Sequence, residues 1–176
     1  MRGETTASPT RVREAVPSSR ERIALWMVLL FTLGGGAVAG YLVWLHAKIA
    51  GNPRKGLCTF TGTISCDKVL ASPYAEIAGI PLGVIGFVGF ALLFGLAAWR
   101  LFGRHRSPRS LPAILTLTAG FGLAFEVVMT WVELFVIEAV CPYCLTALAF
   151  ITASFIAAVC AWRLGRILPS MEVHHA

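Results

Sequence analysis

The chain has 176 residues, of which 57% are hydrophobic and 14% charged, and its formal net charge is +6 at pH 7. Because average soluble domains carry about a quarter charged residues, this composition excludes an ordinary soluble globular protein. The basic residues lie mainly between and beyond apolar segments, where they set membrane topology and contact lipid head groups. They therefore do not indicate binding of nucleic acid.

The apolar residues form four segments, each close to the ~20 residues that a helix needs to cross the bilayer core. They predict an all-α integral membrane protein, with one bundle of four transmembrane helices over residues 23–165. The expected helices span about 23–45, 81–102, 111–138 and 141–164. The expected connections and ends are an outer loop at 46–80, a disordered tail at 1–22 and a short tail at 166–176.

Lysine and arginine residues are unevenly distributed among these connections. Eleven lie in the two tails, at the ends of the helices beside them and in the connection between the second and third helices, whereas four lie in segment 46–80. The positive-inside rule then predicts that both termini are cytoplasmic and that segment 46–80 is on the outer face. We expect a multi-pass protein of a bacterial inner (plasma) membrane.

Four of the five cysteines lie on this outer face, Cys58 and Cys66 in the loop and Cys141 and Cys144 where the last helix begins. Disulfides persist in oxidising outer compartments. A Cys-x-x-Cys pair at a helix start is typical of a redox-active dithiol, because backbone N–H groups and the positive end of the helix dipole stabilise a thiolate. A metal site and an inert or static disulfide are the alternatives, although the seven-residue spacing in the loop is loose for zinc. Cys160, toward the other end of the last helix, is expected to be a buried, unreactive thiol.

Two dithiols on one face predict a relay, in which a thiolate of one pair attacks the disulfide of the other. The second pair adjoins an apolar helix, and a soluble acceptor would not require that position. A quinone dissolved in the membrane would require the pair to lie beside the bilayer. This position favours a quinone as the final electron acceptor.

The order and spacing of three motifs resemble the vitamin K epoxide reductase family, in its bacterial branch, over residues of about 25–165. The motifs are Cys58-x7-Cys66, Ser72-Pro73-Tyr74 with GIPLGVIG at 79–86, and ELFVIEAVCPYC at 133–144. The resemblance implies a four-helix bundle around a quinone, capped by the outer loop and a short half-helix that residues 70–79 would form. A fused thioredoxin-like domain, common in bacterial relatives, is not expected, so the resemblance implies a stand-alone form with a separate partner.

The resemblance also implies a role for each of the four outer cysteines. Cys58 would exchange with a thioredoxin-fold, DsbA-like partner, and Cys66 would pass electrons to Cys141. Cys144 would face the quinone, either ubiquinone or menaquinone, and no metal is implied.

Further residues are candidates for the quinone site. Ser72 matches a serine near the quinone in the family, or it caps the half-helix that Pro73 would begin. Glu133 is a candidate proton route for quinone reduction, or a structural glutamate bonded to a neighbouring helix. Glu126 is expected to lie too deep in the membrane for direct contact with Cys144. The remaining candidates, all aromatic, are Tyr74, Phe87 and Tyr143.

Two departures from the animal enzymes of the family bear on the substrate. Those enzymes have a tyrosine where this chain has Leu148, and an asparagine in the second helix, whereas Asn52 in the outer loop is the single asparagine here. A pocket that lacks both polar contacts is a poor site for opening vitamin K epoxide, so the resemblance favours quinone reduction. The expected function is a membrane thiol oxidase that reduces a quinone and supports disulfide formation in exported proteins. The alternatives are a vitamin K or quinone reductase whose main output is hydroquinone, and a non-enzymatic membrane module with metal-binding or static disulfide cysteines.

Overall fold

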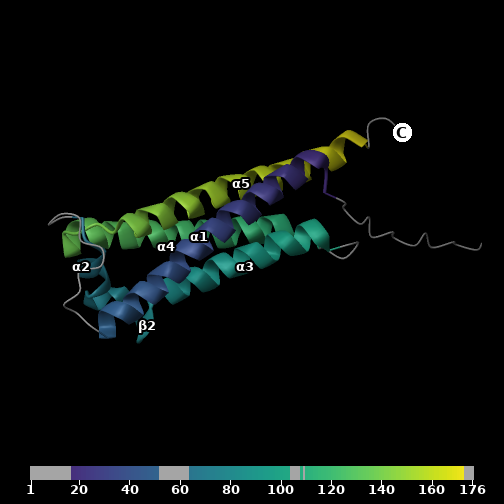
Figure 1. Cartoon of the computed structure of the whole chain (residues 1–176). Coiled ribbons are helices and arrows are strands. Elements are labelled where there is room, and N and C mark those ends of the chain that lie inside the picture. Colours follow the sequence, from purple (N-terminus) through teal and green to yellow (C-terminus); the bar gives the residue numbers. More distant parts are fainter. Residues whose placement is uncertain (1–16, 52–63, 104–107, 109, 173–176) are drawn as a thin grey trace, which may run out of the picture.

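Four long helices dominate the computed structural model, which describes residues 17–51, 64–103, 108 and 110–172 (Figure 1). The long helices are α1 (Ser19–Gly51), α3 (Leu82–Phe102), α4 (Leu111–Val132) and α5 (Pro142–Glu172). The short elements are α2 (Cys66–Leu70), the 3₁₀ helix η1 (Pro73–Ala75), the strands β1 (Glu76–Ile77) and β2 (Ile80–Pro81), and the π-helical segment η2 (Glu133–Ile137) that ends α4. Four helices are long and apolar enough to cross a membrane, which confirms the predicted all-α membrane bundle.

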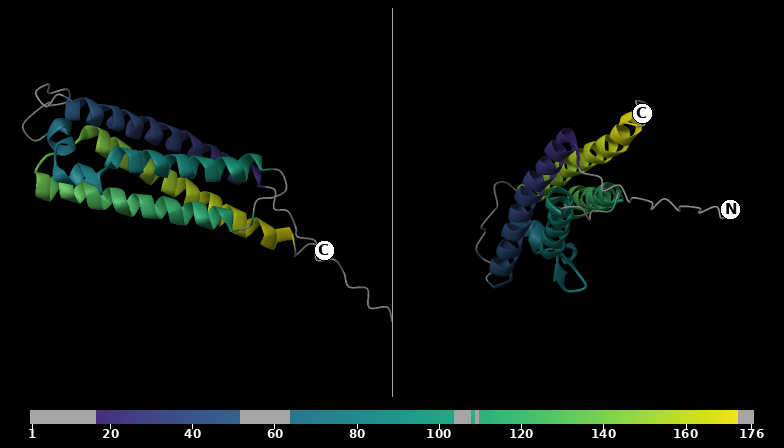
Figure 2. Two further views of the ribbon diagram at one scale, coloured as in Figure 1. Left: turned by 90° about the horizontal axis from the view of Figure 1, so that it is seen from below. Right: turned by 90° about the vertical axis from the view of Figure 1, so that its right-hand side faces the viewer.

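The four long helices run lengthwise along one another (Figure 2). Helix α1 packs along both α3 and α5, and α4 packs along α5 and, less extensively, along α3. The short elements gather at one end of the bundle, whereas the start of α1 and the end of α5 lie at the opposite end (Figure 1). We call the end that carries α2 and the start of α5 the cysteine end.

Tryptophan side chains mark two levels on the outside of the bundle. Trp26 and Trp99 lie toward the end opposite the cysteine end, Trp44 and Trp131 lie toward the cysteine end, and all four are about half exposed. Along α1 the two levels are ~27 Å apart at 1.5 Å per residue. This spacing matches the ~30 Å hydrocarbon core, and tryptophan prefers its two interfaces.

Helix α1 begins at Ser19, four residues before the boundary that apolarity predicted. The reason is a cap and an ion pair. The N–H of Glu21 donates to Ser18 Oγ at 3.2 Å, and the Glu21 carboxylate is bound by Arg100 of α3 with Nη2–Oε1 at 2.8 Å. Both charged side chains are at most 4% exposed. The residues just before the apolar run therefore belong to the helix and not to the tail.

The segment after Cys66 differs from the predicted half-helix at 70–79. A short helix is present, but it is α2, which begins at Cys66 because Ser65 Oγ accepts the N–H of Lys68 at 3.2 Å. Residues 70–79 instead contain η1 and the start of a small antiparallel hairpin in which Ile77 pairs with Ile80. Its two-residue turn has positive φ at Ala78 (52°) and Gly79 (78°), and no helix continues through such residues.

Candidate redox site

Backbone contacts align the two cysteine-bearing segments. Ile64 forms a parallel bridge with Val140, and the N–H of Ser65 donates to the Val140 carbonyl at 3.2 Å. Cys66 directly follows Ser65, and Cys141 directly follows Val140. As a result the Sγ atoms of Cys66 and Cys141 lie 2.8 Å apart, and both residues are 0% exposed.

Cys141 also contacts the second thiol of its own motif. Cys144 lies in the first turn of α5 and is half-buried. Hydrogen bonds from the Cys144 thiol and then from the Cys66 thiol lower the pKa of Cys141 to about 3, with smaller contributions from backbone N–H groups at the start of α5, and they outweigh the burial that raises it. Cys141 thus lies between two sulfur partners, whereas Cys58, which was predicted to pair with Cys66, lies outside the described residues.

Glu133 connects the end of α4 to these cysteines. Its Oε2 accepts the backbone N–H of Cys141 at 3.0 Å, and its carboxyl group also hydrogen-bonds the Cys144 thiol. The side chain is buried at the first position of η2, and the segment closes with Glu138 in the left-handed conformation (φ 53°). The π-helical turn, a feature common at functional sites, leads the chain from α4 back to Cys141. No signal in the sequence predicted this turn.

A cavity of about 70 Å³ lies beside Cys144. Its described lining comes from all four long helices and the segment 69–75 and is apolar apart from Glu126, Glu133 and Cys144. Glu126, seven residues before Glu133 on α4, makes no direct contact with Cys144 that the structure records, but it lines the same cavity. The cavity therefore reaches deeper along α4 than the sequence indicated.

A larger groove of about 450 Å³ runs between α3 and α4. Its only polar lining side chains among the described residues are Thr118 and Glu126, and the groove and the cavity share Gly86, Phe125 and Glu126. Helices α3 and α4 pack against each other less extensively than α4 and α5 do. The groove is thus an apolar space that adjoins the cavity at Cys144.

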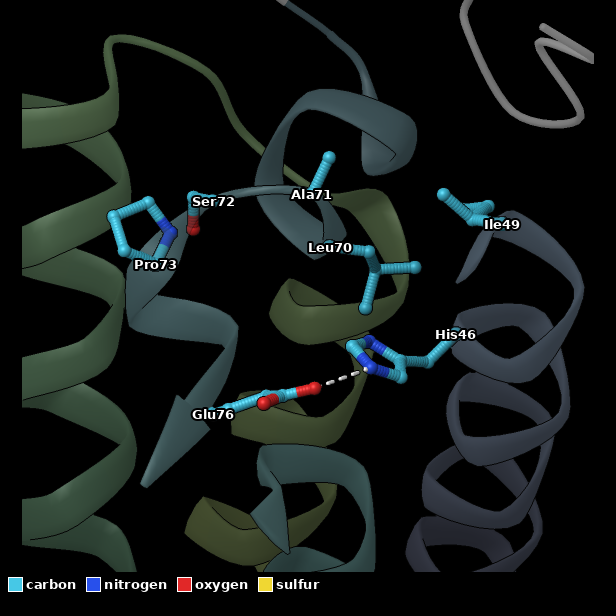
Figure 3. Close-up of a pocket in the computed structure, with 7 residues that line it drawn as sticks. All are labelled: His46, Ile49, Leu70, Ala71, Ser72, Pro73 and Glu76. Atoms are coloured by element: carbon cyan, nitrogen blue, oxygen red, sulfur yellow. Dashed lines mark hydrogen bonds and ion pairs between the residues drawn. The ribbon is translucent and has the colours of Figure 1, made fainter. Parts of the chain in front are cut away.

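A third pocket, of about 490 Å³, lies on the surface of the cysteine end and is separate from the thiols (Figure 3). His46 reaches from α1 toward β1, and its Nε2 lies 3.0 Å from Glu76 Oε1 (Figure 3). Ser72 lines this pocket and donates from Oγ to the Val69 carbonyl at 2.7 Å, so it does not cap η1 through its side chain.

The other predicted quinone residues do not line the cavity beside Cys144 itself, although Ser72 and Tyr74 line a small neighbouring pocket that shares Met129 and Glu133 with it. Tyr74 is exposed, Phe87 is exposed and packs near Gly40 of α1, and the Tyr143 ring lies against Tyr41 with centroids 4.9 Å apart. None of these three residues, nor Ser72, lines the cavity, whereas Glu133 does. A role for those four residues at a quinone stays a prediction.

The exposure of Cys160 and part of the lining of the cavity differ from what the sequence predicted. The expectation of a buried Cys160 is wrong, because this residue is exposed on the same face of α5 as Ile156, where a membrane helix meets lipid. The sequence motifs assigned no role at the quinone site to Phe125 or Gly86, although both line the cavity and the groove. Their contribution depends on how α3 and α4 pack, and no local pattern reveals that.

These features define a class of protein: a membrane-embedded oxidoreductase with two buried thiols in contact and a third thiol beside an apolar cavity. Residues 26–159 match the Vitamin K epoxide reductase family, and the chain belongs to this family. The match confirms the resemblance of the motifs. Membership makes the protein a membrane oxidoreductase that couples thiol–disulfide chemistry to a quinone.

Proposed function

We propose that the protein reoxidises a DsbA-like, thioredoxin-fold partner and passes the electrons through two cysteine pairs to a membrane quinone. The observation that carries the proposal is the position of Cys141. It contacts Cys66 on one side and Cys144 on the other. A sulfur in this position can form a disulfide with either neighbour, and a relay by thiol–disulfide exchange requires that.

The first steps move two electrons from the partner to the second cysteine pair. The partner dithiol reduces the Cys58–Cys66 disulfide and becomes a disulfide itself. The Cys66 thiolate then attacks Cys141 of the Cys141–Cys144 disulfide, which forms a Cys66–Cys141 bond and releases the Cys144 thiolate. Attack of Cys58 on Cys66 restores the first disulfide and releases Cys141 as a thiolate. The low pKa of Cys141 makes it a good leaving group in this step.

The last step transfers the two electrons to the quinone. Cys144 lines the cavity and is the sulfur that faces the acceptor, and the Cys141–Cys144 disulfide re-forms as hydroquinone is released. The Glu133 carboxyl group hydrogen-bonds the Cys144 thiol and is placed to take its proton. Sites for small ligands usually enclose 300–1,000 Å³. The ring of ubiquinone or menaquinone therefore lies across the junction of cavity and groove, with its isoprenoid tail in the groove.

The orientation in the membrane is part of the proposal. Both the start of α1 and the end of α5 lie opposite the cysteine end (Figure 1). Eleven basic residues lie on the side of the termini, whereas four lie in segment 46–80. This asymmetry supports cytoplasmic termini and a cysteine end facing the oxidising outer side of a bacterial inner membrane, where exported proteins gain disulfides.

Trapping of the intermediate tests the relay. In a Cys144→Ser variant the Cys141 thiolate has no partner within its own motif, so it should attack Cys66 of the Cys58–Cys66 disulfide. This exchange forms a Cys66–Cys141 disulfide and releases the Cys58 thiolate, and non-reducing peptide mapping after acid quenching detects the product. A Cys160→Ser variant serves as the matched control and should turn over like the wild type, because Cys160 lies on the outside of α5. Quinone reduction by reduced partner that persists in a Cys58→Ser variant would contradict the first step, and tight binding of a metal ion by the four thiols would contradict the relay.

A further inference from the structure

Glu126 is a carboxylic residue in the middle of a membrane-spanning helix. It lies ~10 Å along α4 from Glu133, half-buried, at the junction of the cavity beside Cys144 and the groove between α3 and α4. Ionisable side chains at this depth are costly for the fold and usually serve a function. The relay described above leaves Glu126 without one.

The other polar groups of the cavity and the groove are already engaged. Glu133 accepts the N–H of Cys141 and bonds Cys144, which is itself the electron donor. Thr118, the other polar side chain in the groove, donates its hydroxyl hydrogen to the Ile114 carbonyl at 2.9 Å. The structure records no hydrogen bond between Glu126 and another described residue. Among the described lining residues, Glu126 is thus the one side chain with a free hydrogen-bonding group.

The surroundings of Glu126 determine what it can offer a ligand. Apolar side chains such as Phe125 and Ile85 line the same groove. A membrane interior favours the neutral carboxylic acid over the carboxylate, since a charge is costly there. A neutral acid has an O–H donor. A quinone carbonyl is an acceptor only, and a buried acceptor without a donor weakens binding.

We propose that Glu126, as a neutral carboxylic acid, donates a hydrogen bond to the quinone carbonyl that lies away from Cys144. This inference rests on the proposed function and names the residue that orients its acceptor. In the redox step the Cys141 thiolate and the Cys144 thiol lose two electrons and one proton as their disulfide forms. The quinone gains both electrons, this proton and a second proton that the reducing dithiol released when it was oxidised, and becomes hydroquinone. Glu126 ends the turnover with the proton with which it began.

Steady-state kinetics of the full-length protein in detergent test the inference, with dithiothreitol as reductant and a short-chain ubiquinone as acceptor. A Glu126→Leu variant should raise the KM for quinone by about tenfold or more, the loss expected for one buried hydrogen bond. A Glu126→Gln variant keeps an N–H donor and should stay within about threefold of the wild type. The matched control is Thr116→Val in the same helix, whose hydroxyl donates to Pro112 and lines neither space, and its KM should not change.

Two results would overturn the inference: an unchanged KM in Glu126→Leu, or a Glu126→Gln variant as impaired as Glu126→Leu. Formation of the Cys66–Cys141 disulfide in a Cys144→Ser background verifies that the leucine variant is folded. Infrared spectra of carbonyl-labelled quinone bound to the wild type provide a second test that needs no variant. One carbonyl stretch should be lowered relative to quinone in detergent, and two unshifted bands would also refute the inference.

Failure of the proposed function gives a different result. A wild-type protein that exchanges thiols but reduces no quinone contradicts the proposed function. A wild type that reduces quinone, paired with a Glu126→Leu variant of unchanged KM, contradicts the role of Glu126 alone.

Discussion

The backbone N–H of Cys141 donates a hydrogen bond to the carboxyl group of Glu133 at 3.0 Å. Through this bond the end of α4 holds the cysteine that precedes α5. The same carboxyl group hydrogen-bonds the Cys144 thiol, so one side chain both positions the sulfur relay and can accept its proton. These two roles make different predictions for substitution of Glu133.

A Glu133→Gln variant should fold normally but reduce quinone slowly. The amide oxygen still accepts the N–H of Cys141, whereas the amide cannot take a proton from Cys144. We expect kcat for quinone reduction to fall about 10²-fold or more, the usual contribution of a general base, at every pH tested. A Glu133→Leu variant also loses the acceptor and should be destabilised by about 1–3 kcal/mol. Wild-type rates in Glu133→Gln across pH would refute the proton-transfer role.

The thiol of Cys141 should stay reactive in mild acid. Its pKa is lowered to about 3, so the thiolate persists as the pH falls from 8 to 5. A Cys66→Ala variant uncovers this buried sulfur and keeps the hydrogen bond from Cys144, which is the largest contribution. Alkylation of Cys141 by iodoacetamide, followed by mass spectrometry, should be nearly independent of pH over this range. An ordinary thiol slows about tenfold per pH unit below its pKa of about 8.5, and the same slope for Cys141 would contradict the prediction.

The buried ion pair between Glu21 and Arg100 should matter most when one partner is removed. An Arg100→Ala variant leaves a buried carboxylate unpaired, and we expect a loss of about 3–5 kcal/mol in unfolding free energy. The double variant Glu21→Leu with Arg100→Met should lose clearly less, since no charge stays buried. Thermal unfolding in detergent measures both. Arg163→Ala, an exposed position on α5, is the control and should change stability by less than about 0.5 kcal/mol. Equal losses in the single and double variants would refute the argument.

Two glycines of α3 should respond differently to the same substitution. A Cβ at Gly83 would lie 3.1 Å from the backbone nitrogen of Val43 and 3.3 Å from the Ala39 carbonyl oxygen, so Gly83→Ala pushes α3 away from α1. We expect a loss of about 1–3 kcal/mol in unfolding free energy, typical of overpacking. A Cβ at Gly89 meets no described atom within 4 Å, and Gly89→Ala is the matched control. A stable Gly83→Ala variant would show that α3 can shift without cost.

Several features could not be predicted from the sequence because they depend on contacts between distant segments. Glu21 and Arg100 are 79 residues apart, and nothing near Glu21 indicates that its helix starts before the apolar run. The half-helix was placed in the wrong segment. A helix does begin at Pro73, but it is the short 3₁₀ helix η1, which ends before the turn at Ala78–Gly79, whereas the α-helix begins after the cap at Ser65. Cys160 was expected to be buried, although in a membrane protein an apolar position often faces lipid instead of protein.

The sequence by itself determined the membrane class, the four helices and the family, because the length of an apolar run and the spacing of cysteines are local properties of the chain. Only the tertiary structure decided which groups meet. The bridge between Ile64 and Val140 brings Cys66 to Cys141. The packing of all four long helices creates the cavity that Glu126 and Cys144 both line. Such contacts depend on how whole helices pack, and helix packing is set by many weak interactions that no single motif encodes.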